Sequence, residues 1–218
     1  MSATSTTTVS TTNGSAADTQ TRILDAAEFL FVEHGYAATS LRAIATEAGV
    51  NLAATNYHFG SKLGLFGAVF HRRVKPINEA RLSNLEALRE SERPLTVRIL
   101  LEAFFSPLRQ GIRDPIMPAL MGRIYAEPRT LTEPILTNEF QHVAMAFQAA
   151  LSEILPDIPL EILRWRFHFM IGSMIQLLQF HAPLGTESTI EKFAEGIPHL
   201  INFVESGLQE PYQEQRHD

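Results

Sequence analysis

Three neighbouring residues, Asn56, Tyr57 and His58, place an amide, a phenol and an imidazole next to one another. Each of these groups can take part in hydrogen bonds, and Lys62 adds a cation four residues further on. No Asp or Glu occurs between residues 48 and 78, so no carboxylate on this run would repel a phosphate. These residue types predict a surface for the phosphates and base edges of a DNA duplex.

Two short helices joined by a tight turn are expected to position these side chains. The first has one apolar face, because four apolar residues recur at helical spacing: Leu41, Ile44, Ala45 and Ala48. Thr39 or Ser40 can cap its start with a side-chain oxygen, and Gly49 allows the sharp turn that follows. Asn51 caps the second helix, expected from about residue 52 to residue 57. A plain helical hairpin inside a core is the alternative.

Residues 39–62 resemble the DNA-binding domain of the TetR/AcrR family of bacterial transcriptional regulators. They contain, in one register, the run T-S-L-R-x-I-A-x-x-A-G-V-N-x-x-x-x-N-Y-H-F-G-S-K. The resemblance covers about residues 20–70. It implies a DNA-binding regulator, most often a repressor, which binds a palindromic double-stranded operator as a homodimer. It also implies that a small effector releases the regulator from that operator.

The family's matching positions imply which residues touch DNA. Arg42 and Asn56 are expected to reach base edges, although Asn56 stands where the family often has Tyr. Tyr57 and His58 are expected to contact the phosphate backbone. Lys62 adds its charge to a helix N-terminus that can hold a phosphate. The full set is Ser40, Arg42, Asn51, Leu52, Ala53, Ala54, Asn56, Tyr57, His58 and Lys62. The alternative for Arg42 is a solvated surface charge.

The chain is expected to divide into four parts. Residues 1–19 are mostly small and polar, and such a segment cannot bury enough apolar surface to become ordered, which predicts a disordered arm. Residues 20–66 form the helix-turn-helix head, and residues 67–209 form a helical effector-binding and dimerisation domain. Residues 210–218 form a polar tail.

Helical spacing and proline positions predict the other elements, and no alternating strand pattern occurs, so the fold class is all-α. A helix over 21–34 is expected to end at Gly35. Another starts near Ser61, is kinked or broken at Pro76, and resumes over 77–90. Five more helices are expected, roughly at 94–107, 115–127, 133–155, 159–181 and 188–206. Residues 159–181 are apolar on nearly every side, and the resemblance implies that this helix and the last one form a four-helix bundle between two copies.

The middle helices are rich in Met and Phe, which suits an ordinary core or an apolar cavity for a small molecule. The candidate effector contacts are Phe104, Phe105, Arg113, Met121, Arg123, Tyr125, His142 and His168. Core packing is the alternative for the apolar residues, and a structural role is the alternative for each histidine. The segment M-G-R-I-Y-A-E-P, at 121–128, and the helix after Asn51 are similar to a fatty-acid-responsive branch of the family. This similarity implies an acyl-type or other apolar effector.

Composition and missing motifs narrow the function. The chain has 18 Lys and Arg against 24 Asp and Glu, a net charge of −6, so DNA binding must rest on a local surface. It has no cysteine, which excludes disulfides and zinc–thiolate sites. No catalytic motif, cofactor-binding loop, secretory signal or membrane span is apparent, so we expect a cytoplasmic protein without catalytic residues, metal or cofactor. A helical enzyme or carrier for an apolar metabolite and a helical adaptor are the alternatives.

Overall fold

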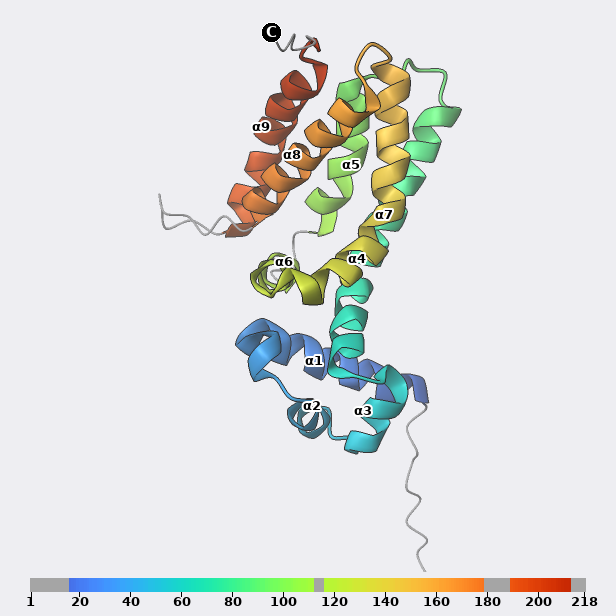
Figure 1. The fold of residues 1–218 in the computed structure, drawn as a ribbon. Coiled ribbons are helices and arrows are strands. Elements are labelled where there is room, and N and C mark those ends of the chain that lie inside the picture. The colour runs from blue at the N-terminus through green and yellow to red at the C-terminus, as the bar shows by residue number, and fades with distance from the viewer. Residues whose placement is uncertain (1–15, 112–115, 179–188, 213–218) are drawn as a thin grey trace, which may run out of the picture. The chain divides into compact units, whose positions relative to one another are not determined.

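The computed structural model describes residues 16–111, 116–178 and 189–212. Within those ranges the chain forms nine helices and no strand, which confirms the all-α class (Figure 1). It divides into two compact units, Met1–Ala68 and Val69–Asp218. The helices are α1 (Ala16–Ala38), α2 (Leu41–Glu47), α3 (Leu52–Phe59), α4 (Lys62–Glu90), α5 (Val97–Gly111), α6 (Ile116–Ala126), α7 (Arg129–Ile154), α8 (Leu160–Leu178) and α9 (Thr189–Gln209).

The first unit has a small apolar core around Phe31 of α1. Phe31 is fully buried and meets Phe66 of α4 edge-on, with the ring centroids 5.0 Å apart. Ile23 and Ile44 are also fully buried, so α1, α2 and the start of α4 share this core. Gly35 has φ of 79° and ends the regular part of α1, as predicted, because that left-handed conformation favours glycine.

α1 begins earlier than the sequence pattern predicts. It starts at Ala16, so residues 16–19 of the expected arm are helical. Asp18 lies in the first turn, where the positive end of the helix dipole stabilises a carboxylate. These residues are small or polar and carry no apolar stripe, which is why periodicity alone does not assign them to the helix. Residues 1–15 lie outside the described residues.

The two candidate caps of α2 have different partners. The hydroxyl oxygen of Ser40 accepts a hydrogen bond from the backbone N–H of Ala43 at 3.1 Å, so Ser40 is the N-cap. Thr39 is buried, and its hydroxyl donates instead to the carbonyl oxygen of Gly35 at 2.8 Å. Thr39 therefore fixes the end of α1 next to the start of α2.

α4 is one helix from Lys62 to Glu90, so of the two expected outcomes, a kink or a break, Pro76 does not cause the break. A proline inside a helix removes one backbone hydrogen bond, but packing of the helical residues before and after the proline can compensate for this loss. Val74, Asn78 and Arg81 are all buried along one stripe of α4, and their contacts stabilise the helix around the proline. Three other helices also continue through prolines, at Pro107, Pro134 and Pro198.

The core of the second unit is centred on Phe104 of α5. Its ring meets the rings of Phe105, Phe147 and Phe167 edge-on, at centroid distances from 5.0 to 6.0 Å. These side chains come from α5, α7 and α8, and α9 packs against both α5 and α8 (Figure 1). The second unit is therefore a helical bundle with an aromatic central layer.

Candidate nucleic-acid interface and internal cavity

α3 presents a polar surface without an acidic group. It turns Ala53, Asn56 and Tyr57 outwards and Thr55 inwards. Tyr57 is 86% exposed, so its phenol is accessible to a partner molecule. The side-chain oxygen of Asn51 accepts from the backbone N–H of Ala53 at 2.9 Å, which makes Asn51 the N-cap of α3. The cap uses the side-chain oxygen of Asn51 and fixes where α3 begins.

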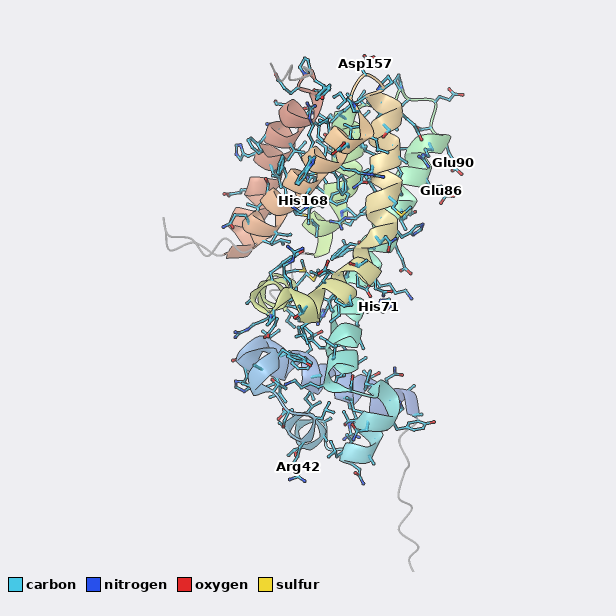
Figure 2. The ribbon with its side chains drawn as sticks, viewed as in Figure 1. Arg42, His71, Glu86, Glu90, Asp157 and His168 are labelled. Atoms are coloured by element: carbon cyan, nitrogen blue, oxygen red, sulfur yellow. The ribbon has the colours of Figure 1, made fainter. Side chains whose placement is uncertain are left out.

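α2 contributes a cation to the same unit. Arg42 is exposed, and its side chain points away from the helix and out of the first unit (Figure 2). α2 packs against α3, so Arg42 and the exposed side chains of α3 are held by one rigid hairpin. Three other residues expected to contact DNA, Leu52, Ala54 and His58, are half-buried.

The turn between α2 and α3 is held by Arg22 of α1, a residue that no sequence motif singles out. Its Nη2 donates to the carbonyl oxygens of Ala48 and Gly49, the latter at 2.9 Å. These carbonyls lie at the C-terminal end of α2, where a cation is electrostatically favourable. Gly49 has φ of 62°, the left-handed conformation predicted for this turn.

Lys62, expected to anchor a phosphate, also has partners inside the first unit. Its ammonium nitrogen donates to the carbonyl oxygen of Thr39 at 2.7 Å. It also lies 3.4 Å from the carbonyl oxygen of Ala37 and 4.2 Å from the centroid of the Tyr36 ring. Lys62 therefore stabilises the junction of α1, α2 and α4 in the free protein.

The second unit contains a partly open cavity of about 830 Å³, bounded by α4 to α8. This volume is within the range of small-molecule sites. Four predicted effector contacts are on its wall: Phe104, Met121, Tyr125 and His168 (Figure 2 labels His168 on α8). Three others are not: Phe105, Arg123 and His142. The eighth, Arg113, lies outside the described residues.

The position of each aromatic ring decides which of them reaches the cavity. Phe105 is fully buried and packs edge-on against Phe104, at a centroid distance of 5.2 Å, so only Phe104 reaches the cavity wall.

The cavity wall also carries polar and charged groups. Partial burial raises the pKa of the Tyr125 phenol, which keeps this group protonated as a donor. Both signs of charge occur at exposed positions of the wall, at Arg129, Glu133 and Arg164.

Arg81 of α4 is a wall residue that is not among the predicted effector contacts. It is 2% exposed, and its guanidinium carbon lies 3.9 Å from the centroid of the Phe104 ring. Burial lowers the pKa of Arg81 to about 9, so the group is still protonated at neutral pH. A sequence signal exists, because Val74, Asn78, Arg81 and Leu85 recur at helical spacing on a buried stripe. A cation on such a stripe needs a partner.

α8 and α9 carry large apolar side chains that their own unit does not cover. Trp165 and Phe169 of α8 are 55% and 62% exposed, and Phe203 of α9 is 71% exposed. Leu177 of α8 is half-buried and lies close to Gly196, where a Cβ would come within 2.6 Å of a Leu177 methyl carbon. Leu177 therefore packs between α8 and α9, whereas the other three side chains face away from the core.

None of the helices in the described ranges is long and apolar enough to cross a membrane. Among the same residues, no group of three or more His, Asp or Glu side chains is arranged to hold a metal ion.

The comparisons with known proteins identify the family. Residues 23–69 match the model of bacterial regulatory proteins of the tetR family, and residues 101–207 match the tetracyclin repressor-like C-terminal domain. The chain therefore belongs to the TetR family of bacterial transcriptional regulators, as its resemblance predicts.

Three curated relatives are similar to part of the chain. The HTH-type transcriptional repressor BepR of Brucella suis is 39% identical over 71 residues, which is 33% of this chain and 34% of that protein. The HTH-type transcriptional regulator SrpR of Pseudomonas putida is 35% identical over 96 residues, 44% of each protein. The uncharacterized HTH-type transcriptional regulator TtgW of Pseudomonas putida is 35% identical over 96 residues, which is 44% of this chain and 70% of TtgW. The chain thus spans less than half the length of BepR and SrpR.

Solved structures support the fold along most of the chain. GusR of Salmonella enterica is 21% identical with a TM-score of 0.63, over 90% of this chain and 97% of that one. A TetR family regulator from Marinobacter aquaeolei VT8 is 19% identical with a TM-score of 0.62, over 88% and 95%. At these identities the comparison supports the fold alone.

Proposed function

We propose that this protein is a homodimeric transcriptional repressor, which binds an operator through α2 and α3 and leaves it when a small effector enters the cavity. One observation carries the proposal. The hairpin of α2 and α3 is held by Arg22 and its caps, and it exposes Arg42, Asn56 and Tyr57 without an acidic group on α3. A rigid helix with small and hydrogen-bonding side chains suits the major groove.

Contacts with DNA divide into reading and anchoring. The accessible side chains of Arg42 and Asn56 suit base edges, because a guanidinium and an amide can each make paired hydrogen bonds there. Tyr57, His58 and Lys62 suit phosphates, which position the protein without reading the sequence. The set expected from the sequence, from Ser40 to Lys62, includes two caps whose side-chain oxygens already accept hydrogen bonds, Ser40 and Asn51. Those two can still donate to a phosphate, through the hydroxyl hydrogen of Ser40 and the amide N–H groups of Asn51.

A second copy of the chain is the proposed partner for α8 and α9. Trp165, Phe169 and Phe203 leave more apolar surface exposed than a stable monomer favours. Association would bury these rings, and a two-fold axis between the copies would present two heads to a palindromic operator.

The cavity of the second unit is proposed to be the effector site. Its volume and its Phe and Met lining suit a small molecule with an apolar body, such as an acyl chain. α4 lines this cavity and also begins in the first unit. An effector that binds better to a dimer with altered head spacing would weaken operator binding by the same coupling free energy.

Selection of bound duplexes from a random pool tests this function. We expect enrichment of a palindromic sequence, followed by release of the selected duplex when a screened apolar compound binds the cavity. Recovery of no enriched sequence at low salt would contradict the proposal and favour a helical enzyme, carrier or adaptor.

A further inference from the structure

Arg81 has more hydrogen-bond donors than acceptors around it. A guanidinium carries five N–H groups. Nε donates to the carbonyl oxygen of Phe104 at 3.0 Å, and Nη1 donates to the side-chain oxygen of Asn78 at 3.3 Å. Nη2 has only the thioether sulfur of Met174, at 3.6 Å, which is a weak acceptor. Two N–H groups of this buried cation therefore have no acceptor among the described residues.

No carboxylate neutralises Arg81 within the part of the chain that the structure describes. The backbone carbonyl of Glu139 accepts from the Asn78 amide nitrogen at 2.7 Å, which turns the neutral oxygen of Asn78 towards Arg81. The carboxylate of Glu139 is engaged with His71, 2.9 Å away. A buried charge without an ionic partner is unfavourable, and here the unpaired charge lies on a cavity wall.

We propose that Arg81 binds the anionic head group of the effector, which is an amphipathic organic anion such as a carboxylate with an apolar body. The apolar body of the effector would lie against Phe104 and Met121. Its head group would accept hydrogen bonds from the two unused N–H groups of Arg81. Paired hydrogen bonds to a charged acceptor are among the strongest that an arginine makes. The inference rests on the proposed function and narrows the class of effector.

A structural role is the competing explanation, because Arg81 connects α4 with α5 and α8 through Phe104 and Met174. The exposed Arg129 and Arg164 on the same wall are two other possible anion contacts. A test must therefore separate head-group preference from stability, and Arg81 from Arg129 and Arg164.

Calorimetric titration of the full-length protein with decanoate, decanol and decylamine provides this test. The three probes have unbranched apolar chains and differ in head-group charge, and each is used below its solubility limit or micelle-forming concentration. We expect decanoate to bind about tenfold more tightly than decanol, as a charge-assisted hydrogen bond provides, and decylamine to bind most weakly. Equal affinities for decanoate and decanol, or no binding by any probe, would overturn the inference.

Two variants assign the preference to a residue. Arg81→Met keeps a long side chain without charge, and it should reduce decanoate affinity to that of decanol while decanol affinity stays unchanged. Arg129→Met and Arg164→Met are the matched controls, and each should keep the preference for decanoate. Loss of the preference in either control, with Arg81→Met keeping it, would overturn the assignment to Arg81. If Arg81→Met does not fold, the two controls still decide, because a preference that both keep supports Arg81 and a preference that either loses contradicts it.

Failure of this inference is distinguishable from failure of the proposed function. Decanoate that binds through Arg81 but leaves operator binding unchanged contradicts the regulatory role and retains the anion site. The opposite result is an uncharged compound that binds in the cavity and releases the operator while decanoate does not bind. That result contradicts the anion site and retains the regulatory role.

Discussion

The ammonium group of Lys62 donates a hydrogen bond of 2.7 Å to the carbonyl oxygen of Thr39. The side chain of Thr39 in turn bonds the carbonyl of Gly35, where the regular part of α1 ends. Lys62 thus connects the start of α4 with the junction of α1 and α2. An ammonium group has three donors, so this bond leaves Lys62 able to contact a phosphate as well.

Replacement of Lys62 by Ala should therefore have two effects. It should weaken binding to operator and random duplex alike and reduce the slope of log affinity against log salt by about one. It should also lower the free energy of unfolding by about 1 kcal/mol, because the short hydrogen bond to Thr39 and the contact with the Tyr36 ring are lost. Salt titrations and denaturant unfolding measure these effects, with Arg89→Ala, an exposed cation of the second unit, as the control. A Lys62→Ala protein with lower stability and an unchanged salt slope would limit Lys62 to a structural role.

Glycine should be required at position 49. Gly49 has φ of 62°, so Gly49→Ala should destabilise the protein by about 1–2 kcal/mol, the cost of a left-handed conformation for an L-residue. Gly122 lies inside α6 with open space around it, so Gly122→Ala should stabilise the protein by about 0.5–1 kcal/mol. Denaturant unfolding at one protomer concentration measures both. Similar effects of the two substitutions would contradict the role of the turn.

The sequence is informative about the head because its signals are local. Gly35, Gly49 and Asn51 act through neighbouring backbone groups, and the structure has them in the predicted conformations or caps. Pro76 does not break α4, because burial along this helix offsets the single hydrogen bond that the ring removes. Local signals alone do not reveal how tertiary packing stabilises a helix.

Cavity residues are harder to predict than the hairpin, because the choice depends on the direction of each side chain in the folded bundle. Phe104 and Phe105 are adjacent and chemically identical, yet only Phe104 reaches the cavity wall. Arg81 lies in a different helix from every predicted effector contact that the structure describes. Its donors meet acceptors that are distant in sequence, such as the carbonyl oxygen of Phe104. Helical periodicity can indicate that a cation lies on a buried stripe, but it cannot predict the hydrogen-bond partners of that cation.

The proposed dimer predicts that charge on α8 or α9 separates the copies. Phe169→Asp and Phe203→Asp should each sediment as a monomer, because an aspartate in an apolar interface would be buried without a partner. Met145→Asp is the matched control, since Met145 is 60% exposed on α7, and it should leave the dimer intact. A charge at Leu177 is a less suitable test of the interface, because Leu177 packs against α9 within one chain. Dimers in both phenylalanine variants would exclude these faces from the interface.

Effector binding should raise thermal stability and weaken operator binding together. A compound at about 100 times its Kd should stabilise the folded protein by about 2.7 kcal/mol through mass action. Linkage requires that operator and effector weaken each other's binding by one common factor. Melting curves and fluorescence anisotropy on labelled operator measure the two quantities. A compound that raises the melting temperature and leaves operator affinity unchanged is a ligand without being the inducer.

Sequence-specific recognition by the α2–α3 face is the central claim, and Arg42 tests it most directly. Fluorescence anisotropy would compare wild type, Arg42→Ala and Arg42→Lys on the selected operator, on single-base variants and on random duplex. If Arg42 reads a base, Arg42→Ala should cost about 1–3 kcal/mol on the operator and lose the preference at one position. Arg42→Lys should retain random binding and lose part of that preference, because it keeps the charge without the planar fork. An Arg42→Ala protein that keeps its full preference at every operator position would contradict the assignment of Arg42 as a reader of base sequence.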